Sequence, residues 1–126
     1  MKMLADNDAC ATLGVKDLAA AREFYESTLG LKPIREEGGE LVTYRTGHTS
    51  INVYRSQHAG TNRSTAVTWI VDDVAEVVAA LKAKGVAFEH YELPGTKREG
   101  DVHLGNGMKL AWFKDPSGNI LNLVSA

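Results

Sequence analysis

The stretch VKDLAAAREFYESTLGL, residues 15–31, decides the fold of this chain. Asp17 stands where a helix N-cap is expected, and apolar residues then recur at three- and four-residue steps. Gly30 supplies the left-handed conformation with which many helices end. The stretch therefore predicts a helix between Asp17 and Gly30, preceded by a strand over residues 9–15 and followed by an extended segment.

The same order of signals occurs a second time along the chain. Residues 66–71, AVTWIV, read as a strand, and Asp73 follows as a second N-cap, with Glu76 placed three residues on to form a capping box. Gly85 ends this second helix, and further apolar runs follow each helix. In both halves the last run carries an asparagine between aliphatic residues, in INVY (residues 51–54) and LNLV (residues 121–124).

Because several independent signals keep one order, the sequence predicts an α+β domain of two repeated βαβββ modules, over about residues 8–56 and 64–125. We expect their strands to form a curved mixed sheet, a cup, with the helices on the outer face. The Gly-rich run over residues 94–107 is predicted to be an irregular loop that either folds over the mouth of the cup or lies in solvent.

The composition is that of an ordinary globular protein of 126 residues, with 44% hydrophobic and 24% charged residues and a formal net charge of -2. No basic tract predicts a nucleic-acid partner, and no apolar run predicts a signal peptide or a membrane partner. With one cysteine, Cys10, the chain cannot form an internal disulfide. The expected location is cytoplasmic.

Two motifs carry a resemblance to a known family: D-x-x-x-A-x-x-F-Y-x-x-x-L-G-L at residues 17–31 and F-x-D-P-x-G-N at residues 113–119. In combination they closely resemble the vicinal oxygen chelate superfamily, also called the glyoxalase/bleomycin-resistance/dioxygenase superfamily. The resemblance implies a paired-module fold whose curved sheet holds a ligand, commonly in a homodimer. In the metal enzymes of this family four strand positions hold a divalent ion, and those positions fall here on Cys10, Asn52, Ala66 and Asn122.

These four residues are not the donors that such an ion prefers, which are imidazoles and carboxylates. Ala66 has no donor atom, Asn52 and Asn122 offer only neutral oxygens, and none of the four histidines stands at an expected position. We therefore predict no metal and no other cofactor. Cys10 is expected to be a small inert residue of the cup, since strand burial raises a thiol pKa.

The two asparagines then have two possible roles, which the sequence leaves open: to satisfy neighbouring polar groups, or to bind a ligand in the cup. The alternation of side chains along a strand places other candidates on the same faces and points Trp69 toward the helices. Whether Trp112 or Phe113 faces the cup is also open. The predicted ligand-binding residues are Cys10, Thr12, Ser50, Asn52, Tyr54, Ala66, Thr68, Trp112, Asn122 and His103.

On this basis the predicted function is a metal-independent small-molecule binding protein of the glyoxalase/bleomycin-resistance type, with an apolar or aromatic ligand in the cup. One alternative is a glyoxalase-like lyase, isomerase or dioxygenase acting on a small oxygenated substrate, although no catalytic residue can be assigned. Another is a regulatory or partner-binding domain with a vestigial cup. The sequence does not identify the ligand, and it does not show whether the cup forms within one chain or across a dimer.

Overall fold

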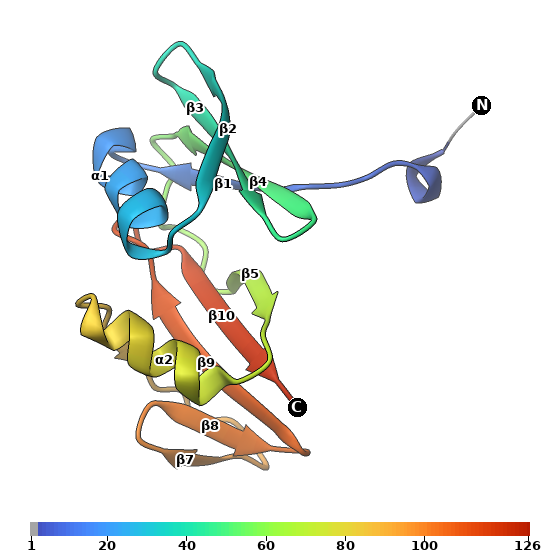
Figure 1. The fold of residues 1–126 in the computed structure, drawn as a ribbon, viewed down its shortest axis with the longest axis vertical. Helices are drawn as coiled ribbons and strands as arrows, with labels where there is room; N and C mark the ends of the chain where they lie inside the picture. Colours follow the sequence, from blue (N-terminus) through green and yellow to red (C-terminus); the bar gives the residue numbers. More distant parts are fainter. Residues whose placement is uncertain (1–2) are drawn as a thin grey trace.

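A computed structural model describes residues 3–126 and shows an α+β fold of two βαβββ-like modules with mixed sheets (Figure 1). A short 3-10 helix, η1 (Leu4–Asp6), precedes the first module. The first module comprises β1 (Ala11–Val15), α1 (Leu18–Arg22), η2 (Glu23–Thr28), β2 (Lys32–Glu37), β3 (Leu41–Thr46) and β4 (Thr49–Arg55). The second comprises β5 (Thr65–Ile70), α2 (Val74–Ala83), β6 (Phe88–Glu89), β7 (Lys97–Glu99), β8 (Val102–Gly105), β9 (Met108–Lys114) and β10 (Ile120–Ser125).

Each module contributes its own hydrogen-bonded sheet. The first has the strand order β1-β4-β3-β2, and the second β5-β10-β9-β8-β7 with β6 also paired to β9. In both, the first strand runs parallel to the last, and the other pairs are antiparallel. The edge strands β1 and β5 contact each other, so the predicted cup is assembled from two mixed sheets that meet at their edges.

The local signals that delimit the helices are present as predicted. Asp17 and Asp73 each accept a hydrogen bond from the backbone N–H three residues on, at 3.1 and 3.3 Å. Gly30 and Gly85 both have positive φ, at 76° and 92°. Two details differ: the first helix widens into the π-helical segment η2, and within residues 3–126 Glu76 makes no reciprocal side-chain bond to complete a capping box.

The predicted irregular loop over residues 94–107 is wrong. The segment forms the hairpin β7–β8, which turns at Gly100 (φ 61°), and β8 pairs with β9. Together β6 and β8 occupy the edge of β9 that corresponds to the place of β2 beside β3. The strand signal is the pair of apolar residues Val102 and Leu104 on either side of His103, and the surrounding glycines obscured it.

Both helices lie on the same side of the sheets, and the hydrophobic core fills the space between (Figure 1). The core contains residues of both modules, including Val15, Tyr25 and Val53 from the first and Phe113 and Leu121 from the second. The opposite face of each sheet is called the cup face below. No helix within the described residues is long and apolar enough to cross a bilayer.

The turn at Asp115 fastens the two modules together. The Tyr25 hydroxyl donates to Asp115 Oδ2 at 2.8 Å, and the backbone N–H groups of Ser117 and Asn119 donate to Oδ1 at 2.9 Å each. The Asn119 side chain donates both to Asp115 Oδ2 (2.8 Å) and to the Gly14 carbonyl in β1 (2.7 Å). Burial first, and then the Asp115 carboxylate, raises the pKa of Tyr25, which therefore remains a donor. The two sequence motifs thus meet at one buried hydrogen-bond network.

Candidate functional site

The repeat extends to the register of the strands on the two cup faces. Each asparagine lies in the last strand of its module, between a residue of the first strand and a residue of the strand before the last. The two sets are Thr12, Asn52 and Thr43 in the first module, and Thr68, Asn122 and Trp112 in the second.

In the first module, neighbouring side chains use the hydrogen-bonding groups of Asn52. The Thr43 hydroxyl donates to its Oδ1 at 2.6 Å, and its Nδ2 donates to Cys10 Sγ at 3.3 Å and to Thr12 Oγ1 at 3.4 Å. This places Cys10, Thr12 and Asn52 together on the cup face, as strand alternation predicts. Thr12 is exposed, so the network faces open space. Cys10 precedes β1 and is also exposed, so the prediction that strand burial makes its thiol inert is wrong.

Asn122 of the second module is more enclosed, with 5% of its surface exposed. Its Nδ2 donates to the carbonyls of Ala111 and Leu123, at 3.0 and 3.3 Å, and the Thr68 hydroxyl donates to its Oδ1 at 3.2 Å. In both modules, therefore, hydrogen bonds to neighbouring groups use the Oδ1 and Nδ2 atoms of the asparagine side chain. A ligand-binding role for the asparagines stays a prediction.

The four family metal positions do not fit a divalent ion. Ala66 has no donor atom, and the amide oxygens of Asn52 and Asn122 already accept hydrogen bonds from threonines. A hydrogen bond joins Asn52 to Cys10, whereas Ala66 and Asn122 lie in the other sheet. Among residues 3–126, no three His, Cys, Asp or Glu side chains come together as a metal-binding group. We therefore derive no chemistry through a metal here.

Of Trp112 and Phe113, Trp112 is the one that faces the cup. The pairing of β9 with β10 has no bulge, so Trp112 lies opposite Asn122 while Phe113 lies opposite Leu121 and joins the core. The Trp112 ring packs edge-to-face against Tyr91, with ring centroids 5.4 Å apart, and its indole N–H donates to Thr65 Oγ1 at 3.2 Å. Trp69 packs against the core, on the helix side as predicted.

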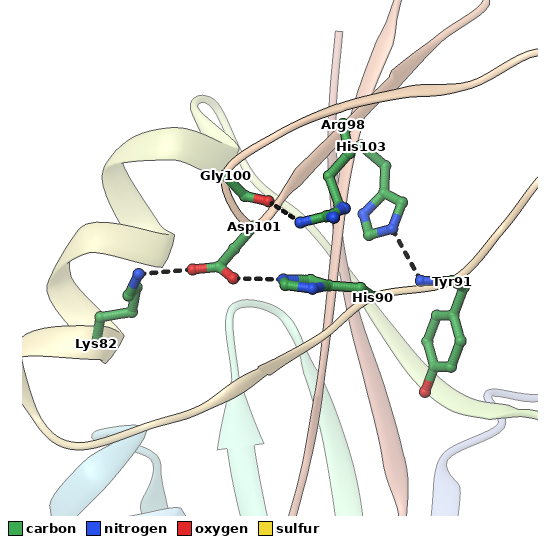
Figure 2. A network of polar contacts seen from close by, with 7 residues as sticks. All are labelled: Lys82, His90, Tyr91, Arg98, Gly100, Asp101 and His103. Atoms are coloured by element: carbon green, nitrogen blue, oxygen red, sulfur yellow. Dashed lines mark hydrogen bonds and ion pairs between the residues drawn. The ribbon is translucent and has the colours of Figure 1, made fainter.

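His103, predicted to lie in a loop, is instead in β8 and only 1% exposed. Its ring stands edge-to-face on Trp112 at 4.9 Å, and its Nε2 accepts the backbone N–H of Tyr91 at 3.1 Å (Figure 2). Because Nε2 is an acceptor, the neutral ring carries its proton on Nδ1, which is buried without a hydrogen-bond partner in the described part of the chain. His103 is thus an internal support of Trp112, and a ligand reaches it only if neighbouring residues move.

Beside His103, an ion-pair network ties the β7–β8 turn to the end of α2. Asp101 accepts from Lys82 Nζ and from His90 Nε2, each at 2.7 Å (Figure 2). The Lys82 ammonium first, and then His90, lowers the pKa of Asp101 below its usual value. The sequence analysis did not identify this network, because its members come from three elements.

Two cavities lie against the candidate residues. One of about 190 Å³ is at the junction of the modules and is lined by Thr12, Tyr54 and Ala66 among others. The other, of about 430 Å³, lies beside the N-terminal arm and is lined by Asp8, Ala9, Cys10, Ile34, Arg45, His48, Thr49 and Ser50. Of the predicted ligand-binding residues, five line neither cavity: Asn52, Thr68, Trp112, Asn122 and His103.

Arg45 and His48 are cavity residues that the sequence analysis missed. Arg45 lies two residues after Thr43 on β3 and is paired with Ser50, so the same strand alternation would have placed it on the cup face. His48 lies in the turn between β3 and β4, where alternation gives no information.

Two βαβββ modules with adjoining sheets and helices on one side define a paired-module class of fold. The chain belongs to the Glyoxalase/Bleomycin resistance protein/Dioxygenase superfamily, which it matches over residues 8–123. No curated protein matches the sequence significantly.

Solved structures of similar fold include both enzymes and binding proteins. Lactoylglutathione lyase from Agrobacterium tumefaciens aligns with a TM-score of 0.69 at 20% identity, covering 95% of this chain and 93% of that one. A glyoxalase family protein from Enterococcus faecalis gives a TM-score of 0.73 at 19% identity, covering 97% and 99%. An antibiotic binding protein from Streptomyces sp. CB03234 gives 0.66 at 20% identity, covering 98% of each chain. At these identities the likeness shows the fold alone.

Proposed function

We propose that this protein binds a small apolar or aromatic molecule on its cup face without a metal ion. The observation that carries the proposal is the replacement of the family metal ligands by neutral groups that bond to one another, Asn52 to Cys10 and Thr12, and Asn122 to Thr68. Neutral hydrogen-bonding groups suit an uncharged ligand, because neither partner has a charge to desolvate. The antibiotic binding protein of similar fold supports the same class of function.

The junction cavity is the place we propose for the ring of the ligand. Tyr54 is 38% exposed and lines this cavity together with Thr12 from the first module and Ala66 from the second. An aromatic side chain beside small and hydroxyl-bearing residues allows ring stacking together with a hydrogen bond at the ligand edge. The cavity volume of about 190 Å³ suits one small ring system.

The proposal includes a homodimer and a cytosolic location. Ile70 on β5 is 88% exposed, which is an unfavourable arrangement for a large aliphatic side chain in water. A second copy of the chain would cover this residue. The cytosolic location rests on the ordinary charge and the lone cysteine. Sedimentation equilibrium tests the dimer: we expect twice the chain mass, and a shift toward the monomer in Ile70→Lys.

Ligand binding is tested by thermal unfolding with increasing 1-naphthol, a neutral aromatic probe. A ligand at a hundred times its dissociation constant stabilises the folded state by about 2.7 kcal/mol, so binding gives a saturable rise in Tm. We expect Tyr54→Ala to reduce this rise strongly. Trp69→Phe, a change on the helix side, should lower Tm by a similar amount at every ligand concentration and leave the rise intact.

A parallel test removes the carboxamides. Asn52→Leu takes away the hydrogen bonds at the partly open network, and Asn52→Leu combined with Asn122→Leu takes away both. We expect weaker probe binding in the first variant and none in the second, with circular dichroism confirming the fold. Unchanged affinity in a folded double variant would remove the asparagines from the site.

A further inference from the structure

The larger cavity contains an arginine that has no partner within the described residues. Arg22, Arg35 and Arg55 each form an ion pair with a glutamate. The Arg45 guanidinium forms neither an ion pair nor a hydrogen bond with any of residues 3–126, and it lines the cavity of about 430 Å³. That volume lies within the usual range for small-molecule sites.

The groups around Arg45 suit an acid group. Ser50 supplies a hydroxyl donor and His48 an imidazole, both lining the same cavity, whereas the Thr49 hydroxyl already donates to the Thr46 carbonyl at 3.0 Å. A guanidinium binds a carboxylate through two parallel N–H bonds, and hydroxyl groups can satisfy the remaining lone pairs. Cys10 also lines the cavity, and its Sγ accepts the Asn52 amide that belongs to the cup network. Asn52 thus links this cavity, through Cys10, to Thr12 of the proposed ligand site by hydrogen bonds.

Asp8 is the one carboxylate of the cavity lining, and it forms no ion pair with the Arg45 guanidinium. It carries no ion pair with any other described residue either. Its charge opposes an acid ligand, so it limits the cavity to ligands with few negative charges. Asp8 and Arg45 should then change acid binding in opposite directions.

We infer that this cavity binds a small aromatic or apolar monocarboxylate whose acid group is held by Arg45. The inference goes beyond the proposed function, because this cavity is separate from the junction cavity that is proposed for an uncharged ring. It assigns Arg45 as the residue that selects acids over neutral analogues of the same shape.

Cys10 allows a direct test, because it is the only cysteine, is exposed and lines the cavity. Iodoacetate and iodoacetamide both alkylate a thiolate with loss of iodide, but only iodoacetate is an anion. The rate constant for iodoacetate divided by that for iodoacetamide therefore reports the local charge. A change in the reactivity of the thiol itself affects both rate constants equally and cancels in the ratio. Relative to wild type we expect this ratio to fall about two- to fivefold in Arg45→Gln and to rise by a similar factor in Asp8→Asn, the order for one exposed charge in a screened cavity.

Protection of Cys10 by benzoate measures binding itself, with benzamide as the neutral analogue. We expect the benzoate concentration for half-protection to rise about tenfold or more in Arg45→Gln, since bonds to charged groups are the strong ones. Arg63→Gln, which removes an exposed arginine that does not line the cavity, is the matched control and should behave as wild type. Circular dichroism of each variant checks the fold.

The outcomes separate this inference from the proposed function. Equal protection by benzoate and benzamide would overturn the acid site and leave aromatic binding standing. Benzoate protection that depends on Arg45, in a protein that 1-naphthol does not stabilise, would support the acid site and refute the neutral-ligand proposal. Rate ratios and protection that are the same in Arg45→Gln and Arg63→Gln would overturn the inference.

Discussion

Removal of the Tyr25 hydroxyl tests whether the Asp115 turn holds the two modules together. In Tyr25→Phe the Asp115 carboxylate loses one of four donors and keeps Ser117 N–H, Asn119 N–H and the Asn119 side chain. The lost bond joins a neutral donor to a carboxylate in a site where Asp115 is 4% exposed and Tyr25 is fully buried. Bonds of this kind contribute about 1.5–3 kcal/mol.

We therefore expect Tyr25→Phe to lower the free energy of unfolding by about 2 kcal/mol, since three donors remain at the carboxylate. For a chain of this length the corresponding fall in Tm is roughly 6–12 °C. Urea denaturation followed by circular dichroism measures the change, and the slope with denaturant should stay constant because the unfolded surface is unaltered.

Tyr91→Phe is the matched control, because the Tyr91 hydroxyl donates no hydrogen bond to any described residue. It should change stability by less than about 0.5 kcal/mol, as surface-type substitutions do. Asp115→Asn should cost more than Tyr25→Phe, because its new N–H groups would face donors wherever the amide is turned. A loss in Tyr25→Phe no larger than in Tyr91→Phe would refute the reasoning.

Three further predictions concern other parts of the fold. Gly60→Ala should destabilise by more than about 2 kcal/mol in urea denaturation, because Gly60 has φ +77° and an added Cβ would clash with the Ser117 carbonyl oxygen. Gly47→Ala, in open space, should show only the cost of its positive φ. Asn122→Asp should cost about 2 kcal/mol or more at pH 7 and less at pH 4, where protonation restores a donor toward the Ala111 and Leu123 carbonyls. Because the folded-state pKa of Asp101 is lowered by Lys82 and His90, its contribution to the free energy of unfolding is present above about pH 4 and is lost as the pH falls below that value. Lys82→Met should reduce this loss of stability in acid, which is at most about 1 kcal/mol for so exposed a lysine.

The elements and faces of this fold could be predicted where the deciding interaction is local. Asp17 and Asp73 cap helices through bonds that span three residues, and the alternation around Asn52 follows from the geometry of a single strand. The β7–β8 hairpin escaped prediction because its strands are short and are stabilised by pairing with β9 rather than by their own composition.

The candidate site was predictable only in part, because some of its contacts are local to one module and others depend on how distant segments pack. Cys10 and Asn52 share a network because their strands are neighbours in one module. The cavities depend on where the N-terminal arm and the junction of the sheets lie, which no local pattern encodes. His103 was assigned to a ligand because a histidine in a glycine-rich run reads as an exposed loop residue, but pairing of β8 to β9 buries it under Tyr91.

The asparagines in mid-strand, finally, have a physical reason that also bears on function. At position 122 the side chain faces two backbone carbonyls and one hydroxyl donor. A residue there must therefore supply two N–H groups and one acceptor. A carboxamide meets that need without a charge, whereas a carboxylate would face two carbonyl oxygens and require a cation to be stable there. The hydrogen-bonding groups of Asn122 are thus satisfied by its neighbours without a charge, and under the proposal above the acid group of a ligand is bound elsewhere, by Arg45.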